Sequence, residues 1–226
     1  VLKGEKSLHE FGLRNKEVSS NIFVSGITGS GKTTTVLTFL HRWFLQGKSA
    51  IIFDWKGDYI NLLKPLQIAD VSLIDRLWIF SVGKDGFRFN PLRSPESVDT
   101  MTWIETFTDM FIHAFGLREP SASILVRCLK ELYEEINIPT LSELNEKVQQ
   151  YQPLSNFDKE SWRSIVTRLM LLTEVSLGPV FSTRIGVKLE DMMKRFVIFD
   201  LSRIPLLENK RFLIEVIYGM VYEYLK

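Results

Sequence analysis

The chain has 226 residues, of which 45% are hydrophobic and 24% charged, a balance that excludes an intrinsically disordered chain. A formal net charge of +1 excludes the overall basicity of a monomeric DNA-binding domain, so any nucleic-acid contact must be local. The single cysteine, Cys128, excludes an intramolecular disulfide.

Targeting signals are not evident in the sequence. No apolar run reaches the roughly 20 residues that a membrane-spanning helix needs, and the N-terminal stretch VLKGEKSLHEF lacks the apolar centre of a signal peptide. We therefore expect a cytoplasmic protein with no membrane segment in this chain. Because the sequence begins with Val1 and stops inside an amphipathic helical pattern, we also expect it to be a fragment.

The first elements alternate between strand and helix. The segment NIFVSG (21–26) has the β-branched and aromatic content of a buried strand, and a helical pattern follows the glycine-rich loop and stops at Gly47. AIIFD (50–54) and LWIFS (77–81) are continuous apolar strands, as in a parallel sheet with helices on both faces. This order predicts an α/β fold.

From Ser94 to about Leu177 the pattern is almost entirely helical. The first helix opens with Ser94 and Pro95 and ends at Gly116, and a later one begins with the capping box of Thr140 and Glu143. Strand character returns in RFVIFDLS (195–202), and a last helix places an apolar stripe inward, formed by Leu213, Val216, Ile217, Met220 and Tyr224. We predict a core domain formed by 1–93 and 191–226, with a helical subdomain inserted at 94–190.

The loop GITGSGKT (26–33) fits the pattern Gly-x-x-x-x-Gly-Lys-Thr at every position, between a predicted strand and a predicted helix. Glycines let the backbone amides curl around a phosphate, and the start of the helix adds its positive dipole end. We predict that Lys32 contacts the β- and γ-phosphates of ATP and that the Thr33 hydroxyl binds Mg²⁺. The predicted nucleotide-binding residues are Gly26, Thr28, Gly29, Ser30, Gly31, Lys32, Thr33 and Thr34.

A P-loop also requires a carboxylate at a strand end to hold the water shell of the metal. Asp54 and Asp200 each follow four apolar residues, so the pattern alone does not choose between them, and neither is followed by glutamate. Asp58 is a third candidate, although Gly57 and Tyr59 indicate a turn in which aspartate serves the backbone. Three scattered histidines give no zinc spacing.

Four segments resemble the HerA/FtsK superfamily of hexameric DNA-pumping ATPases, and its HerA branch with the related conjugation and type IV secretion ATPases in particular. They are GITGSGKTTT, IIFDWKGDY, FNPL (89–92) and FVIFDLSRIP, in matching order along essentially the whole chain. The resemblance implies a RecA-like P-loop NTPase core with a mostly parallel sheet and an inserted helical subdomain. It also implies ATP and Mg²⁺ as cofactors, double-stranded DNA as a partner, a homo-hexamer in the complete protein, and a nuclease, secretion or packaging partner.

The same resemblance implies a further strand after the last helix, carrying the acidic Walker B pair, and this sequence stops before it. We accordingly predict low ATPase activity for the chain alone. Asp200 remains the preferred catalytic carboxylate, acting on Mg²⁺ through water beside Lys32, with a solvated strand-end aspartate as the alternative. Arg184 is a candidate arginine finger, against the alternative of an ordinary surface arginine.

Three functions fit these residues. The preferred one is a DNA translocase or helicase that couples ATP hydrolysis to movement of double-stranded DNA. A small-molecule P-loop kinase needs arginines over the phosphates, and only Arg168 and Arg184 stand in the segment that would form its lid. A nucleotide-switched interaction module is the third, favoured by the missing glutamate.

Overall fold

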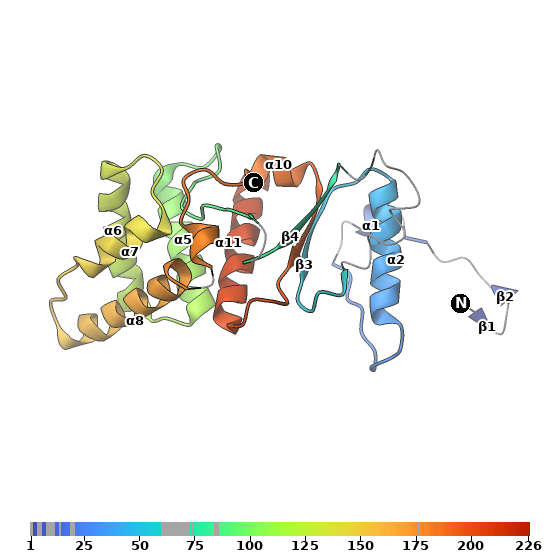
Figure 1. The fold of residues 1–226 in the computed structure, drawn as a ribbon, viewed down its shortest axis with the longest axis horizontal. Helices are drawn as coiled ribbons and strands as arrows, with labels where there is room; N and C mark the ends of the chain where they lie inside the picture. The colour runs from blue at the N-terminus through green and yellow to red at the C-terminus, as the bar shows by residue number, and fades with distance from the viewer. Residues whose placement is uncertain are drawn as a thin grey trace. The chain divides into compact units, whose positions relative to one another are not determined.

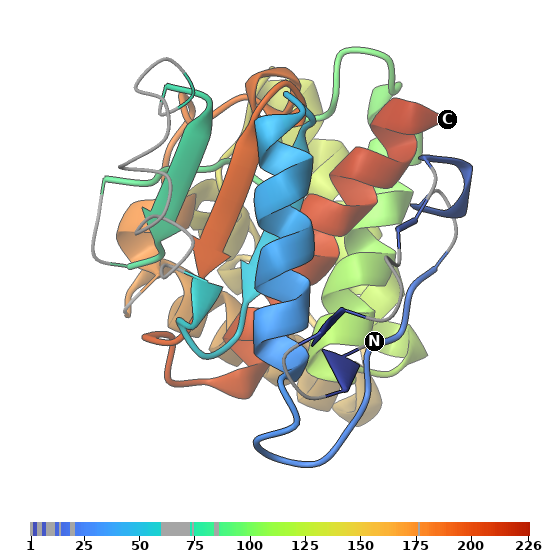
Figure 2. The same cartoon turned by 90° about the vertical axis from the view of Figure 1, so that its right-hand side faces the viewer.

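The computed structural model describes residues 2–3, 6–7, 12–13, 15–18, 21–59, 73, 75–83, 86–175 and 177–226. The chain divides into two compact units, Val1–Arg42 and Trp43–Lys226. Figures 1 and 2 show the course of the chain.

The first unit contains a short antiparallel pair of strands, β1 (Leu2–Lys3) and β2 (Lys6–Ser7), followed by helix α1 (Asn15–Val18). Helix α2 (Lys32–Leu45) starts in this unit and ends in the second. The prediction of a strand at 21–26 is wrong, because these residues have no strand structure and Phe23 is 91% exposed. A strand needs hydrogen bonds from a neighbouring strand, which a favourable local composition does not supply.

The second unit is built on a parallel sheet in the order β3-β5-β4. Its strands are β3 (Ala50–Asp54), β4 (Leu77–Ser81) and β5 (Phe196–Asp200), and all three confirm the sequence prediction. In this register Asp54 and Ser81 both pair with Asp200, so the three strands end together. The strand that comes last in the sequence is therefore the central one.

Strand β5 is buried along its whole length and has a different neighbour on each face. Val197 and Phe199 belong to the main hydrophobic core, whereas the ring of Phe196 meets that of Phe44 edge to face, 5.2 Å between centroids. Side chains alternate between the faces of a strand, so a run of five apolar residues is what burial on both faces requires.

The helices of the second unit stack in layers beyond the sheet, with α11 next to it, then α5, then the group α6, α7 and α8 (Figure 1). Their bounds are α5 (Thr100–Phe115), α6 (Glu119–Glu135), α7 (Leu141–Gln149), α8 (Asn156–Thr173), α9 (Gly178–Phe181), α10 (Leu189–Met193) and α11 (Leu207–Leu225).

Local signals predicted most helix ends correctly. The capping box of Thr140 and Glu143 is present, and Gly116 closes α5 with a φ of 60°. The start of α5 was predicted too early, at Ser94, because Asp99 caps the helix by accepting a hydrogen bond from the Thr102 N–H. An aspartate with a helical pattern after it was a stronger start signal than the Ser-Pro pair.

Helix α11 buries most of the residues predicted to face inward, including Leu213, Val216, Ile217 and Met220. Tyr224 was predicted inward and is instead 37% exposed, because the helix passes beyond its packing partner near its end. One continuous hydrophobic core joins this helix, the sheet and the helical layers. The domain boundaries at 93/94 and 190/191 stay predictions.

Candidate functional site

The phosphate loop is shaped by three glycines. Gly26, Gly29 and Gly31 have φ values of 155°, 81° and 84°, which side-chain-bearing residues rarely adopt. A Cβ on residue 26 would also lie 2.6 Å from the Ser30 hydroxyl oxygen. The glycine spacing of the motif therefore reflects backbone curvature that other residues would oppose.

Helix α2 begins at Lys32, directly after this loop, so Lys32, Thr33 and Thr34 form its first turn. Their backbone N–H groups have no acceptor within the described part of the chain, since the first intrahelical bond runs from the Thr35 N–H to the Gly31 carbonyl. The ammonium group of Lys32 donates to the Ile27 carbonyl at 2.6 Å. These unpaired donors and this folded-back cation suit a phosphate group, which would replace the carbonyl as the partner of Lys32.

The remaining predicted nucleotide-binding residues lie where the motif requires. Thr28 and Gly29 form the turn of the loop, and Ser30 closes it with an N–H bond to the Ile27 carbonyl at 3.2 Å. The Thr33 side chain is exposed in the first turn of α2, so its hydroxyl is accessible to a metal ion. The loop thus brings Gly26, Thr28, Gly29, Ser30, Gly31, Lys32, Thr33 and Thr34 together in the first unit.

In the second unit, Asp54 and Asp200 lie side by side in register at the carboxyl edge of the sheet. The carboxylate of Asp54 is 1% exposed and accepts four backbone N–H bonds. Oδ1 accepts from Lys56, Gly57 and Asp58 at 3.3, 2.9 and 3.2 Å, and Oδ2 accepts from Tyr59 at 2.7 Å. All four bonds come from the loop that follows β3, so Asp54 builds that loop.

Asp200 has a different set of contacts. Its Oδ1 accepts one bond, from the Ser202 N–H at 2.9 Å, and its Oδ2 has no hydrogen-bond donor within the described residues. A Cβ at residue 57 would lie 3.2 Å from the Ser202 hydroxyl and 3.5 Å from Asp200 Oδ1, so the β3 loop reaches the neighbouring strand end closely. The contacts leave Asp200, and not Asp54, with an oxygen available to a metal-bound water.

Tyr59 closes the β3 loop, and burial raises the pKa of its phenol, as do the charges of Asp54 and Asp58. Asp58 itself is exposed and already has an interaction partner. Sequence reasoning found Gly57 and Tyr59 as turn residues but missed the exposed Trp55 between Asp54 and the turn, although an indole directly after a buried strand was a usable signal.

The FNPL segment has a structural role in this fold. The buried Asn90 amide donates to the Pro139 carbonyl at 2.9 Å and accepts from the Leu92 N–H at 2.9 Å. The Tyr133 hydroxyl donates to the Leu92 carbonyl. The segment therefore fastens the chain that leaves the sheet to the helical layer.

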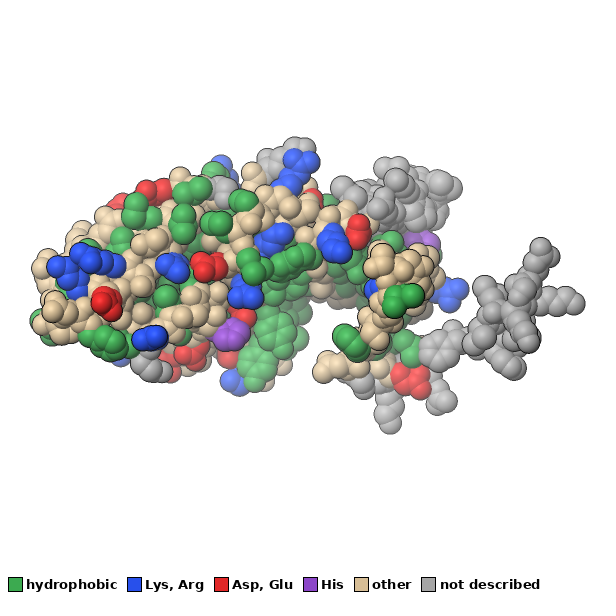
Figure 3. Space-filling model, turned by 90° about the horizontal axis from the view of Figure 1, so that it is seen from below, with side chains coloured by type: hydrophobic (Ala, Val, Ile, Leu, Met, Phe, Trp, Pro, Cys, Tyr) green, Lys and Arg blue, Asp and Glu red, His purple; other side chains and the backbone are tan. Residues whose placement is uncertain are grey.

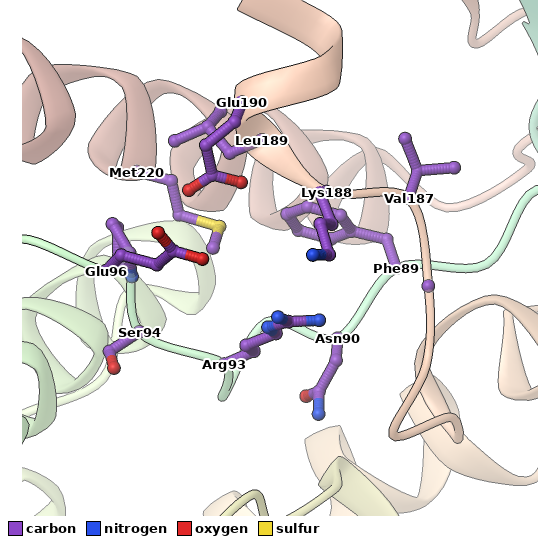
Figure 4. A pocket seen from close by; sticks show the side chains of 12 residues that line it. Phe89, Asn90, Arg93, Ser94, Glu96, Val187, Lys188, Leu189, Glu190 and Met220 are labelled. Carbon is purple, nitrogen blue, oxygen red and sulfur yellow. The ribbon is translucent and has the colours of Figure 1, made fainter.

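A small pocket lies next to this segment (Figure 4). Arg93 and Lys188 point into it from opposite sides, and Glu96 and Glu190 lie on its Met220 side. Two cations and two carboxylates leave it without net charge. A polyphosphate has a better site in the glycine loop, which offers unpaired N–H donors and a lysine without any carboxylate among its residues.

The candidate arginine finger, Arg184, forms an ion pair within its own chain, with Glu143 of the α7 capping box. No three His, Cys, Asp or Glu side chains among the described residues group as a metal site. In the same part of the chain, no helix is long and apolar enough to cross a membrane.

Residues 10–221 match the family model described as the central domain of the helicase HerA. The chain belongs to this HerA family. Its fold is similar to that of VirB4 from Thermoanaerobacter pseudethanolicus, with a TM-score of 0.60 and 20% identity over 88% of this chain. The match covers 55% of that VirB4 chain, so this chain spans about half the length of its structural neighbour. No curated protein matches it significantly.

The family match identifies a HerA-type P-loop domain, and the similarity to VirB4 concerns its fold. They confirm the predicted α/β class, with a small parallel sheet and many helices.

Proposed function

We propose that this chain is the ATP-binding motor domain of a translocase or helicase that couples ATP hydrolysis to movement of double-stranded DNA. The observation that carries the proposal is the loop 26–33, whose glycine curvature and unpaired helix-start N–H groups suit a triphosphate. Membership of the HerA family supports the motor class.

In this proposal Lys32 would neutralise charge on the β- and γ-phosphates, and the Thr33 hydroxyl would hold Mg²⁺. Asp200 would hold a water of the magnesium shell through its Oδ2, which accepts no hydrogen bond from the described residues. Bound Mg²⁺ would supply neutralisation of the phosphate charge. Gly26, Thr28, Gly29, Ser30, Gly31 and Thr34 complete the phosphate cradle.

The motor is proposed to work in the cytoplasm as a homo-hexameric ring. Head-to-tail contacts between subunits favour closed rings, and a ring multiplies weak local contacts with DNA. Phosphate contacts from a few lysines or arginines per subunit would give sequence-independent binding despite the net charge of +1. A nuclease, secretion or packaging partner would determine what the translocation serves.

The kinase alternative has less support, because both arginines available for a lid lie beside a carboxylate of this chain. Arg184 pairs with Glu143, and Arg168 lies 3.8 Å from the carboxylate of Glu208. Neither arginine side chain is therefore positioned to bind the phosphate of a second substrate. No contact in the described part of the chain favours the nucleotide-switched module over hydrolysis.

The nucleotide assignment is tested by calorimetric titration of ATP into the chain and its Lys32→Ala variant. Loss of a charge-assisted hydrogen bond should weaken binding by about 10- to 100-fold, while the fold is retained because Lys32 lies outside the hydrophobic core. Lys48→Ala removes an exposed lysine beyond the end of α2 and should bind ATP normally. Equal ATP affinity in folded wild type and Lys32→Ala would refute the phosphate loop.

The motor assignment is tested by measuring ATP hydrolysis and light scattering with blunt duplex DNA present. We expect a low basal rate of hydrolysis that rises with duplex DNA of any sequence, and DNA binding that weakens steeply with salt. A ring formed with a non-hydrolysable ATP analogue would support the pump. Hydrolysis indifferent to DNA in a protein that stays monomeric would favour the kinase or switch.

A further inference from the structure

Trp55 is an exposed aromatic residue on a rigid loop. It lies between the end of β3 and the turn that Asp54 organises through four backbone N–H bonds. Even so, 42% of its surface is exposed. Because the backbone on both sides of Trp55 is fixed, little conformational entropy would be lost when a ligand binds to the indole. An exposed, rigid aromatic ring is suited to stacking on a flat ligand.

One cation lies over this ring, and two more stand next to Trp55 or Ser202 in the sequence. The Lys210 ammonium from α11 lies 4.8 Å from the Trp55 ring centroid, over one face of the indole. Lys56 follows Trp55 directly, and Arg203 is next to Ser202, which the β3 loop contacts at Gly57. Neither Lys56 nor Arg203 has an ion-pair partner among the described residues.

Three of the acidic residues close to this edge are already engaged, whereas Asp200 keeps one oxygen that accepts no hydrogen bond from the described residues. Asp54 accepts its four N–H bonds, Asp58 has its own partner, and Glu208 lies 3.8 Å from Arg168. Figure 3 views the side on which the strands end, and both cationic and acidic side chains lie there beside hydrophobic ones. The exposed indole and the lysine over it suit a ligand that carries a flat ring and an anionic group.

We propose that Trp55, Lys56, Arg203 and Lys210, together the Trp55 surface, bind a nucleic-acid strand by stacking the indole on an unpaired base while the three cations contact phosphates. This inference rests on the proposed DNA-translocating function and deepens it, because a duplex offers an unpaired base only at an end or a fork. The motor therefore engages DNA where a single strand is exposed, and the Trp55 surface distinguishes such ends from continuous duplex.

The test measures fluorescence anisotropy with three labelled DNAs: a blunt duplex, the same duplex with a single-stranded overhang, and a single strand. We expect the wild-type chain to bind the overhang about tenfold more tightly than the blunt duplex, and Trp55→Ala to remove that difference, as loss of one stacked base predicts. Lys210→Gln should lower the slope of log affinity against log salt by about 0.7 on the single strand.

Phe157→Ala and Lys159→Gln are matched controls, since both residues are exposed on α8 in a different part of the second unit. They should bind all three DNAs as the wild type does. Circular dichroism melts of every variant separate lost contacts from lost folding.

Two results would overturn the inference while the motor stands: equal wild-type affinity for blunt and overhang DNA, or unchanged binding by Trp55→Ala. The base that stacks on Trp55 could also be the adenine of ATP, and titration of ATP distinguishes the two. Lower ATP affinity in Trp55→Ala would show that the indole stacks on adenine and would overturn the inference. A wild type that binds none of the DNAs refutes the DNA part of the proposed function as well, whereas the Lys32→Ala titration reports on nucleotide binding independently.

Discussion

The ends of strands β3 and β5 look alike in sequence and differ in structure. Each is four apolar residues followed by aspartate, and the two aspartates pair in register. Asp54 accepts four N–H bonds and fixes the loop after it, whereas Asp200 accepts one on Oδ1. The comparison teaches that a strand-end carboxylate is available for chemistry only when the following backbone leaves its oxygens unused.

The largest expected effect is loss of stability in Asp54→Ala. Removing the acceptor of four N–H groups, two of them on exposed residues, should lower the free energy of unfolding by about 3 kcal/mol, measured by urea denaturation. Asp54→Asn keeps one acceptor oxygen and should lose only about 1 kcal/mol. If both variants unfold like the wild type, Asp54 does not build the loop.

Asp200→Asn should show the opposite pattern, with stability changed by less than about 1 kcal/mol. Because the variant weakens the hold on magnesium-bound water, hydrolysis of Mg-ATP should fall roughly 10- to 100-fold, measured by phosphate release under single-turnover conditions. Asp54→Asn is the matched control and should hydrolyse at the wild-type rate. Reversed results for the two variants would exchange the proposed roles of the aspartates.

Gly57→Ala tests the contact between the two strand ends. Its φ of 81° and the 3.2 Å approach of a Cβ to the Ser202 hydroxyl should together cost about 1 to 2 kcal/mol of unfolding free energy. Gly86→Ala is the control, because a Cβ there meets nothing within 4 Å and φ is not positive. Equal stability of the two variants would show that the loop tolerates a side chain at residue 57.

The smallest expected effect is on the titration of Tyr59. Burial is the main cause of its raised pKa, and the charge of Asp54 adds to it. Asp54→Asn should therefore lower the pKa of Tyr59 without returning it to the ordinary value. The titration is measured by ultraviolet absorbance, and the Tyr59→Phe variant shows which of the six tyrosines gives the signal.

The sign of the linkage follows from the same shift. A raised pKa in the folded state gives stability that is fully present below about pH 10, the unfolded value, and lost as pH rises through the folded value. The wild type should lose this contribution at higher pH than Asp54→Asn. If the free energy of unfolding changes with alkaline pH in the same way in both proteins, the charge of Asp54 does not affect the pKa of Tyr59.

The phosphate loop was predictable because every feature it needs is local. Glycine conformations, the position of Lys32 and the unpaired N–H groups of a helix start all follow from adjacent residues. The three strands of the sheet and the capping box at Thr140 were read correctly for the same reason. The strand expected at 21–26 was not, because pairing depends on a neighbour that local composition does not reveal.

By itself, the sequence determined that this is a P-loop ATPase domain with a parallel sheet and a helical layer, since periodicity and motif spacing are written in neighbouring residues. Only the tertiary structure decided that β5 is the central strand and that Arg184 forms an ion pair with Glu143. It also decided that Asp200, unlike Asp54, keeps one oxygen that accepts no hydrogen bond from the described residues. It also placed Lys210 over Trp55. These outcomes depend on contacts between segments far apart in the chain, and short-range pattern carries no information about which distant segments will meet.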